Sequence, residues 1–237
     1  MRGHAVALLV SALVLASCSG DDGKGSNFST KSNGGTTTTE EFHIDSLPID
    51  LSADVWAWPV NVDQWPASQF PPIHLFGKDY MGKVESTLTF DMVKVGTTVL
   101  APITGRVKDV RPQPETCDVE IYIDSETAQQ QLSLDHVVAT VKKGDRIVAG
   151  QAVATVPAWD CKESFGRFEL MMVRDVGGVV QAFCPIDFLS DAIASRTNAD
   201  IAKVMTTWNS HAAGAKSAYS DQELANGVCA TPTAPAN

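Results

Sequence analysis

The chain has 237 residues, of which 44% are hydrophobic and 19% are charged, and its formal net charge is -10 at pH 7. This length and composition can support one sizeable core with additional tails. No cluster of Lys and Arg occurs in the sequence. Because phosphate binding needs such clusters, the acidic balance argues against nucleic acid as a partner.

Residues 1–18 have the pattern of a bacterial lipoprotein signal peptide. Arg2 precedes an apolar and small-residue run that ends in the letters LASC at Cys18. The run is shorter than the about 20 apolar residues of a membrane-spanning helix. LASC resembles the lipobox, in which the cysteine is lipidated and becomes the first residue. We therefore expect an exported protein, anchored to a membrane through Cys18 and facing the periplasm or the cell surface. An ordinary signal peptide with a coincidental cysteine is the alternative.

The rest of the chain divides by composition. Residues 19–41 are rich in Gly, Ser, Thr and acidic residues and are predicted to form a flexible linker. Residues 42–189 form the predicted β domain. Residues 190–228 form a predicted helical segment, because apolar residues recur there at near-helical intervals. Residues 229–237 contain Pro, Ala and Thr and are predicted to be a tail.

Short alternating segments predict β-strands within residues 42–189. The segment DVEIYIDS alternates apolar and polar residues, as a half-buried strand does. The segment HVVATVKKGDRIVAGQAVATV contains three strands separated by turns at Gly144 and Gly150. Since no helix intervenes, the pattern predicts a compact all-β barrel or sandwich, followed by the C-terminal helical segment.

Most of residues 56–189 resemble the lysostaphin-type peptidoglycan metalloendopeptidase family. The matching segments, in chain order, are WAWPV, FGKDY, VGTTVLAPITGRV, LSLDHV, GRFELMM and FCPIDFL. The resemblance implies a β domain of the duplicated hybrid motif type. Members of the family bind zinc through a His-x-x-x-Asp motif and through the second histidine of a His-x-His motif, and two further histidines flank the zinc-bound water.

The resemblance also implies that the first zinc motif is incomplete. Asp79 in FGKDY matches its aspartate. Counting back, the histidine position falls on Leu75, and His74 lies one residue away. A one-residue slip in an extended strand sends the side chain to the opposite face. His74 and Asp79 are therefore the remaining metal-ligand candidates, and His74 is alternatively an ordinary loop or surface histidine.

The second zinc motif is replaced. Phe165 and Arg167 stand at the two His-x-His positions, and only His136 keeps the place of a flanking catalytic histidine. An arginine is a permanent cation and cannot ligate a metal. We therefore expect a degenerate zinc site with no cofactor, in which Asp79 and Arg167 form an ion pair. The alternatives are a structural hydrogen bond for His136 and, if a local bulge recruits His74, a bound zinc.

Four cysteines remain once Cys18 is assigned to the lipid: Cys117, Cys161, Cys184 and Cys229. An even number in an oxidising compartment predicts two disulfides, and spacing alone allows three pairings. In the family fold, the loops that carry Cys117 and Cys161 border the same groove. The resemblance thus implies a Cys117–Cys161 bridge and leaves Cys184 to pair with Cys229.

The predicted function is that of a cell-envelope lipoprotein with an inactive peptidase-like domain. It would bind peptidoglycan, or position or activate a cell-wall hydrolase. One alternative is an active zinc metalloendopeptidase that cleaves peptidoglycan cross-links, and another is a structural lipoprotein without a ligand. Trp56, Trp58 and Trp65 lie close together in the sequence. They fit either a platform for glycan or peptide or a hydrophobic cover for a small barrel.

Overall fold

The computed structural model describes residues 42–60, 62, 70–126, 128–213 and 215–236. The chain divides into two units, Met1–Thr38 and Thr39–Asn237, and every described residue belongs to the second. The predicted signal peptide, the lipidation site Cys18, the linker and Trp65 lie outside the described residues. No helix in the described part of the chain has the length and hydropathy needed to cross a membrane.

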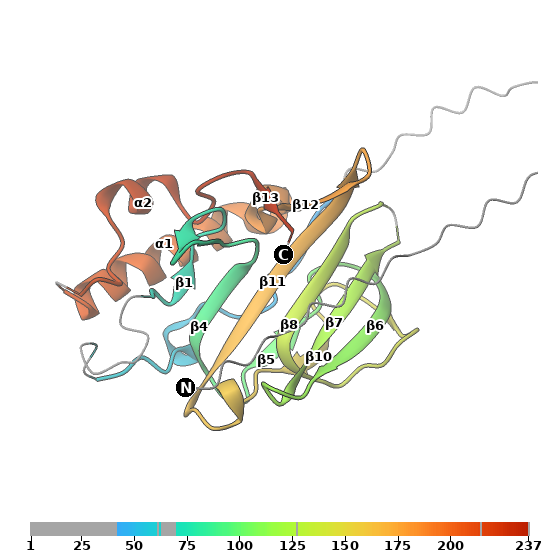
Figure 1. Ribbon diagram of the computed structural model, residues 1–237, viewed down its shortest axis with the longest axis horizontal. Helices are drawn as coiled ribbons and strands as arrows, with labels where there is room; N and C mark the ends of the chain where they lie inside the picture. The colour runs from blue at the N-terminus through green and yellow to red at the C-terminus, as the bar shows by residue number, and fades with distance from the viewer. Residues whose placement is uncertain (1–41, 61, 63–69, 127, 214, 237) are drawn as a thin grey trace, which may run out of the picture. The chain divides into compact units, whose positions relative to one another are not determined.

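An antiparallel sheet of 11 strands dominates the described structure (Figure 1). Its main path runs through β1 (Ile73–His74), β4 (Leu88–Lys94), β11 (Phe165–Val176), β8 (Gln131–Ala139), β7 (Asp118–Ser125), β6 (Gly105–Gln113) and β9 (Arg146–Ile147). Four further strands join it off this path: β5 (Thr98–Leu100), β10 (Ala152–Thr155), β12 (Val179–Phe183) and β13 (Thr233–Pro235). A separate hairpin pairs β2 (Asp79–Tyr80) with β3 (Lys83–Val84).

Alternation along the strands buries one face of this sheet. Its core positions are almost fully inaccessible on the central strands and include Leu88, Phe90, Leu132, Leu134, Ile121, Ile123, Phe168 and Leu170. β4 pairs with β11, with Phe90 opposite Phe168, and their rings stack at a centroid distance of 6.0 Å. The predicted all-β class is confirmed, and the sheet is an open antiparallel one.

The predicted helical segment is confirmed as α1 (Asp191–His211), followed by the short α2 (Asp221–Asn226). Asp191 in the first turn and His211 in the last complement the helix dipole. Both helices lie toward the β1 edge of the sheet in Figure 1. The Tyr219 hydroxyl, between the two helices in the sequence, exchanges hydrogen bonds with the backbone of Ile73 at 3.0 and 2.8 Å. This contact fixes β1 in place.

Two further segments cover the core. Trp56 and Trp58 contact each other at a ring distance of 5.9 Å, and Trp58 contacts Trp208 of α1 at 5.4 Å. Both belong to the hydrophobic core or pack against it, as the hydrophobic-cover interpretation predicts. Pro185 begins the 3-10 helix η4 (Pro185–Phe188) rather than an α-helix. Within the segment predicted as a tail, β13 pairs with β12.

Candidate functional site

The opposite face of β4, β11, β8 and β7 carries polar side chains, and we call it the polar face. Its members lie in or beside these strands: Thr87, Thr89, Asp91, Asp118, Asp135, His136, Arg167 and Glu169. The register places Glu169 opposite both Thr89 of β4 and Asp135 of β8, so one row of polar side chains crosses three strands. Charged groups this close can only be stable if they pair.

His74 lies in a saturated cluster at the β1 end of the polar face. Its Nε2 lies 3.1 Å from Asp91 Oδ2 and its Nδ1 lies 3.3 Å from Glu85 Oε2. The side chain is only 3% exposed and stacks on Phe70 at a ring distance of 5.3 Å. The expectation of an ordinary surface histidine is therefore wrong. Neither ring nitrogen is left to ligate a metal while these contacts hold.

The electrostatics of this cluster favour an imidazolium between two carboxylates. Burial lowers the pKa of His74, but the hydrogen bonds to Asp91 and Glu85 outweigh it and raise the pKa above its ordinary value. Burial raises the pKa of Glu85, whereas the hydrogen bonds from His74 and Thr87 lower it to about 2. Burial opposes ionisation of Asp91 as well, and its bond with His74 brings the pKa below its ordinary value.

The neighbouring residue Leu75 lies in the hydrophobic core, at 1% exposure. The two consecutive side chains therefore occupy different environments, as the argument from a one-residue slip requires. A bulge that would turn His74 into the Leu75 position is absent from β1, which pairs with β4 in regular register through Ile73–Phe90 and His74–Thr89.

Asp79 lies away from this cluster, exposed on the β2–β3 hairpin. Its Oδ1 accepts a hydrogen bond from the Gly82 amide at 2.6 Å. Among the described residues it forms no ion pair with Arg167, whose Nε instead donates to Glu169 Oε1 at 2.6 Å. The expected Asp79–Arg167 pair is therefore wrong. The reason is topological, because the hairpin that carries Asp79 is not part of the large sheet.

The carboxylates that do surround Arg167 come from other positions. Burial lowers the pKa of Arg167, and the charges of Glu169, Asp91 and Glu85 outweigh this and raise it. The guanidinium also lies over the Trp159 ring at 5.1 Å. Gly166 permits this arrangement, because a Cβ there would lie 2.5 Å from the carbonyl oxygen of Pro157 in the segment that leads to Trp159.

Asp91 is the main residue that sequence reasoning missed. Thr87 and Asp91 have the same spacing as a His-x-x-x-Asp motif, on the strand that pairs directly with β11. A single charge inside the otherwise apolar and hydroxylic segment LTFDMVK was the available signal. With threonine in the histidine position, however, Thr87 offers a neutral hydroxyl where zinc would require a basic nitrogen.

His136 forms a second cluster on β8. Its Nδ1 lies 2.9 Å from Asp118 Oδ2 and 3.9 Å from Asp135 Oδ1, and its Nε2 lies 3.7 Å from Glu169 Oε1. Its ring meets the Trp159 ring edge-on at 4.6 Å. The residue has a φ of 57° at a point where the β7–β8 register shifts. This bulge turns the imidazole toward Asp118 rather than along the regular strand.

The carboxylates around His136 are held by neighbours of their own. Thr116 donates to Asp118 Oδ1 at 2.8 Å, and the His136 amide donates to Asp135 Oδ1 at 2.7 Å. Burial lowers the pKa of His136, but the bond to Asp118 and the charges of Asp135 and Glu169 raise it overall. Burial raises the pKa of Asp135.

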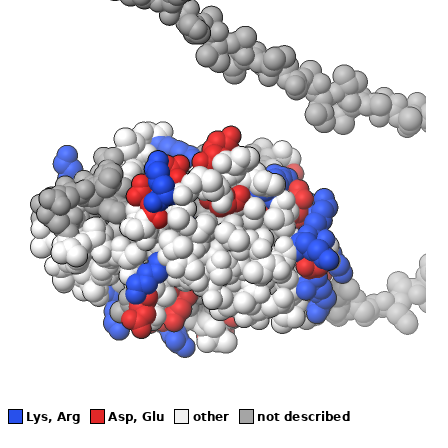
Figure 2. Space-filling view, turned by 90° about the horizontal axis from the view of Figure 1, so that it is seen from below, with Lys and Arg blue, Asp and Glu red and all other residues white. Residues whose placement is uncertain are grey.

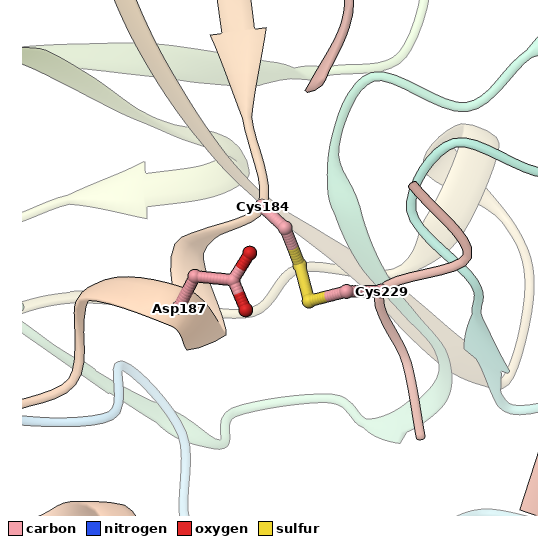
Figure 3. Close-up of side chains that lie close together, drawn as sticks. All are labelled: Cys184, Asp187 and Cys229. Atoms are coloured by element: carbon pink, nitrogen blue, oxygen red, sulfur yellow. A yellow bond between two sulfur atoms is a disulfide. The ribbon is translucent and has the colours of Figure 1, made fainter. Parts of the chain in front are cut away.

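Two groups of side chains have ligand atoms close enough for a metal ion. Asp118, Asp135 and His136 offer two oxygens and one nitrogen within 4.8 Å of one another. Cys184, Asp187 and Cys229 form the other group, shown in Figure 3. There the two sulfurs are joined in a disulfide, so they are not thiolate ligands, and the Asp187 carboxylate lies beside the bridge.

Both predicted disulfides are present, Cys117–Cys161 and Cys184–Cys229. The predicted zinc set is not assembled. His74 uses both nitrogens, Asp79 lies on a separate hairpin, and Phe165 and Arg167 offer no ligand atom. The residues at the expected positions therefore do not fit zinc. The only fitting donor set on the polar face, as far as the structure describes it, is Asp118, Asp135 and His136.

Figure 2 shows that basic side chains on one face of the molecule are accompanied by acidic ones at its periphery, around a broad uncharged area. A surface that binds the nucleic-acid backbone would instead gather basic side chains into a patch.

No family model matches the chain, and no curated protein matches it. Solved structures that resemble it include lysostaphin in solution, with 15% identity and a TM-score of 0.39, over 53% of this chain and 49% of that chain. A zinc containing peptidase from Vibrio cholerae has 19% identity and a TM-score of 0.39, over 56% and 37%. The catalytic domain of the prophage-encoded M23 protein EnpA from Enterococcus faecalis has 18% identity and a TM-score of 0.36, over 46% and 89%.

The resemblance concerns the fold. The matched region spans about half the length of the lysostaphin structure.

Proposed function

We propose that this protein is an exported envelope lipoprotein whose lysostaphin-like β domain binds peptidoglycan without cleaving it. The observation that carries the proposal is the state of Arg167. A permanent cation, paired with Glu169 and placed over Trp159, occupies the position where the resemblance requires a zinc-binding nitrogen. Hydrolysis of the family type needs three protein ligands and a metal-bound water.

A concave site beside Arg167 supports binding. A cavity of about 270 Å³ is lined by Phe70, His74, Tyr80, Lys83, Glu85, Arg167 and Glu169. It lies slightly below the volume of about 300–1,000 Å³ that is typical of small-molecule sites. Aromatic walls and a few charged groups suit one or two residues of a peptide, and cell-wall cross-links are peptides.

One observation favours the alternative of an active metalloenzyme. The Asp118–Asp135–His136 group has the number and kinds of ligand atoms that zinc accepts. If the protein carries a metal, we expect it there. These three residues would hold it, and the metal would supply a Lewis acid to that end of the polar face.

The test uses the purified full-length protein, insoluble peptidoglycan and added zinc. We expect the protein to sediment with the peptidoglycan and to release no soluble fragments. Release of fragments that a chelator stops would refute the proposal. An Asp118→Asn variant that also loses the release would assign it to the alternative.

The lipoprotein assignment has its own test. A Cys18→Ser variant should leave the membrane fraction or remain unprocessed, because the lipid is the expected anchor. A matched Cys117→Ser variant alters the disulfide and leaves lipidation untouched. If the Cys18→Ser protein fractionates and migrates like the parent, the lipoprotein assignment is wrong.

A further inference from the structure

The cavity beside Arg167 has its acidic groups satisfied. Glu85 Oε2 bonds His74, and the Thr87 hydroxyl lies 2.7 Å from Glu85 Oε1 and 3.1 Å from Glu169 Oε2. Glu169 Oε1 accepts from Arg167 Nε. Each lining carboxylate thus has a donor to both of its oxygens, although the single Thr87 proton goes to one of them at a time.

The basic groups of the cavity are not satisfied in the same way. A guanidinium has five N–H donors. Within the described part of the chain, Arg167 uses only Nε in a hydrogen bond, and its terminal nitrogens donate to no protein group. The side chain is 23% exposed, so these donors are partly shielded from water. Lys83, which also lines the cavity, forms no ion pair in the same described part.

We propose that Arg167 binds the free carboxylate of a short peptide in this cavity, through its two terminal nitrogens. A carboxylate matches the two parallel donors of a guanidinium, and such charge-assisted pairs are among the stronger hydrogen bonds. The inference deepens the proposed function, since it rests on peptidoglycan binding and names the group that is recognised.

The remaining walls define the rest of the ligand. Phe70 and Tyr80 lie with ring centroids 5.8 Å apart on the side of His74. They offer an apolar contact for a small aliphatic side chain next to the carboxylate. Lys83 and Arg167 balance Glu85 and Glu169 in charge, so a single negative charge meets no net repulsion from the permanent charges of the lining.

The decisive comparison uses two ligands that differ only at the terminal group. N-acetyl-dialanine with a free carboxylate and its carboxamide are titrated against the full-length protein by calorimetry or by NMR. We expect the carboxylate form to bind about tenfold or more tightly, the ratio for losing a charge-assisted hydrogen bond. Equal affinity for the two forms would overturn the inference. So would a preference for dialanine amide with a free amino group, or tighter binding of inorganic phosphate.

Variants locate the effect. Arg167→Gln should abolish the preference for the carboxylate form, and Arg167→Lys should reduce it, because lysine keeps the charge without the paired donors. Arg174→Gln is the matched control: the same substitution on the same strand, at a side chain that lies over Phe183 and does not line the cavity. Thermal unfolding identifies a variant that fails to fold. The ligand comparison on the unchanged protein still decides the question in that case.

The inference and the proposed function can fail separately. If the protein sediments with peptidoglycan but binds acid and amide equally, the inference fails and the function stands. If the acid is preferred through Arg167 but intact peptidoglycan is not bound, the function fails and the carboxylate site stands.

Discussion

Two histidines share the polar face of one sheet, and their surroundings differ. His74 lies on β1 between Asp91 and Glu85, at 3.1 and 3.3 Å, with 3% of its side chain exposed. His136 lies on a bulge of β8 with one hydrogen bond to Asp118 at 2.9 Å and 12% of its side chain exposed. Its Nε2 is 3.7 Å from Glu169, too far for a hydrogen bond.

The difference separates a structural histidine from one that can still bind something. His74 has both nitrogens committed and rings stacked beside it, so it stabilises the junction of β1 and β4. His136 keeps one nitrogen available and two carboxylates within ligand distance of the other. Hydrogen-bond saturation, rather than residue type or proximity to acids, distinguishes the two roles.

The largest predicted effect breaks the His74 cluster. A His74→Gln substitution should lower the free energy of unfolding by about 3–5 kcal/mol, because it strands two buried carboxylates. His136→Gln should cost less, about 1.5–3 kcal/mol, the value of one hydrogen bond to a charged group. Urea unfolding with the disulfides intact measures both. Equal losses would show that the two clusters do not differ as described.

The two disulfides provide the next test, since each lies beside one histidine. Cys117 precedes Asp118 and Cys161 follows Trp159 by two residues, whereas Cys229 forms a backbone bridge with Phe76, two residues after His74. The bridges close loops of similar length, with sequence separations of 44 and 45. Each should therefore contribute about 2–4 kcal/mol.

Their removal should also be locally selective. Replacing Cys117 and Cys161 by serine should shift the NMR signals of the His136 ring and leave those of His74 unchanged. Replacing Cys184 and Cys229 should do the reverse. Equal disturbance of both rings by either pair would mean that the two ends of the polar face are rigidly coupled.

The sequence was sufficient for the parts that depend on local pattern. Alternation and glycine turns predicted the strands, and helical spacing predicted α1. The disulfide pairing followed from the family resemblance and is confirmed. The opposite environments of His74 and Leu75 followed from strand geometry alone.

The site was harder to predict because its contacts are long-range. His74 meets carboxylates 11 and 17 residues further along the chain, and Arg167 lies close to Asp91 only because β11 pairs with β4. Assigning the zinc-motif aspartate to Asp79 placed it on a hairpin outside the sheet. No periodicity in the sequence distinguishes Asp79 from Asp91, and only the strand pairing does.

The smallest predicted effect is a pH dependence that should differ between the two histidines. The folded pKa of His74 is raised above 6.5, so its contribution to stability is complete below pH 6.5 and is lost as the pH rises through the folded pKa. The pKa of Glu85 is lowered from 4.5 to about 2, so its contribution is present above pH 4.5 and is lost as the pH falls toward 2. Asp91, whose pKa is also lowered, loses its contribution in acid as well.

The stability difference between the parent and His74→Gln should therefore be greatest between pH 4.5 and 6.5 and decline on both sides. Each titrating proton limits the slope to about 1.4 kcal/mol per pH unit. The pKa of His136 is raised too, so His136→Gln should show the alkaline decline. It should lack the contribution of Glu85 in acid, because that carboxylate bonds His74 and not His136. Urea unfolding of the three proteins across this pH range measures the two profiles. A His74 difference that stays flat from pH 4.5 to 8.5 would show that the imidazole is neutral in the folded protein, and the cluster would then be a hydrogen-bonded network rather than an ionic one.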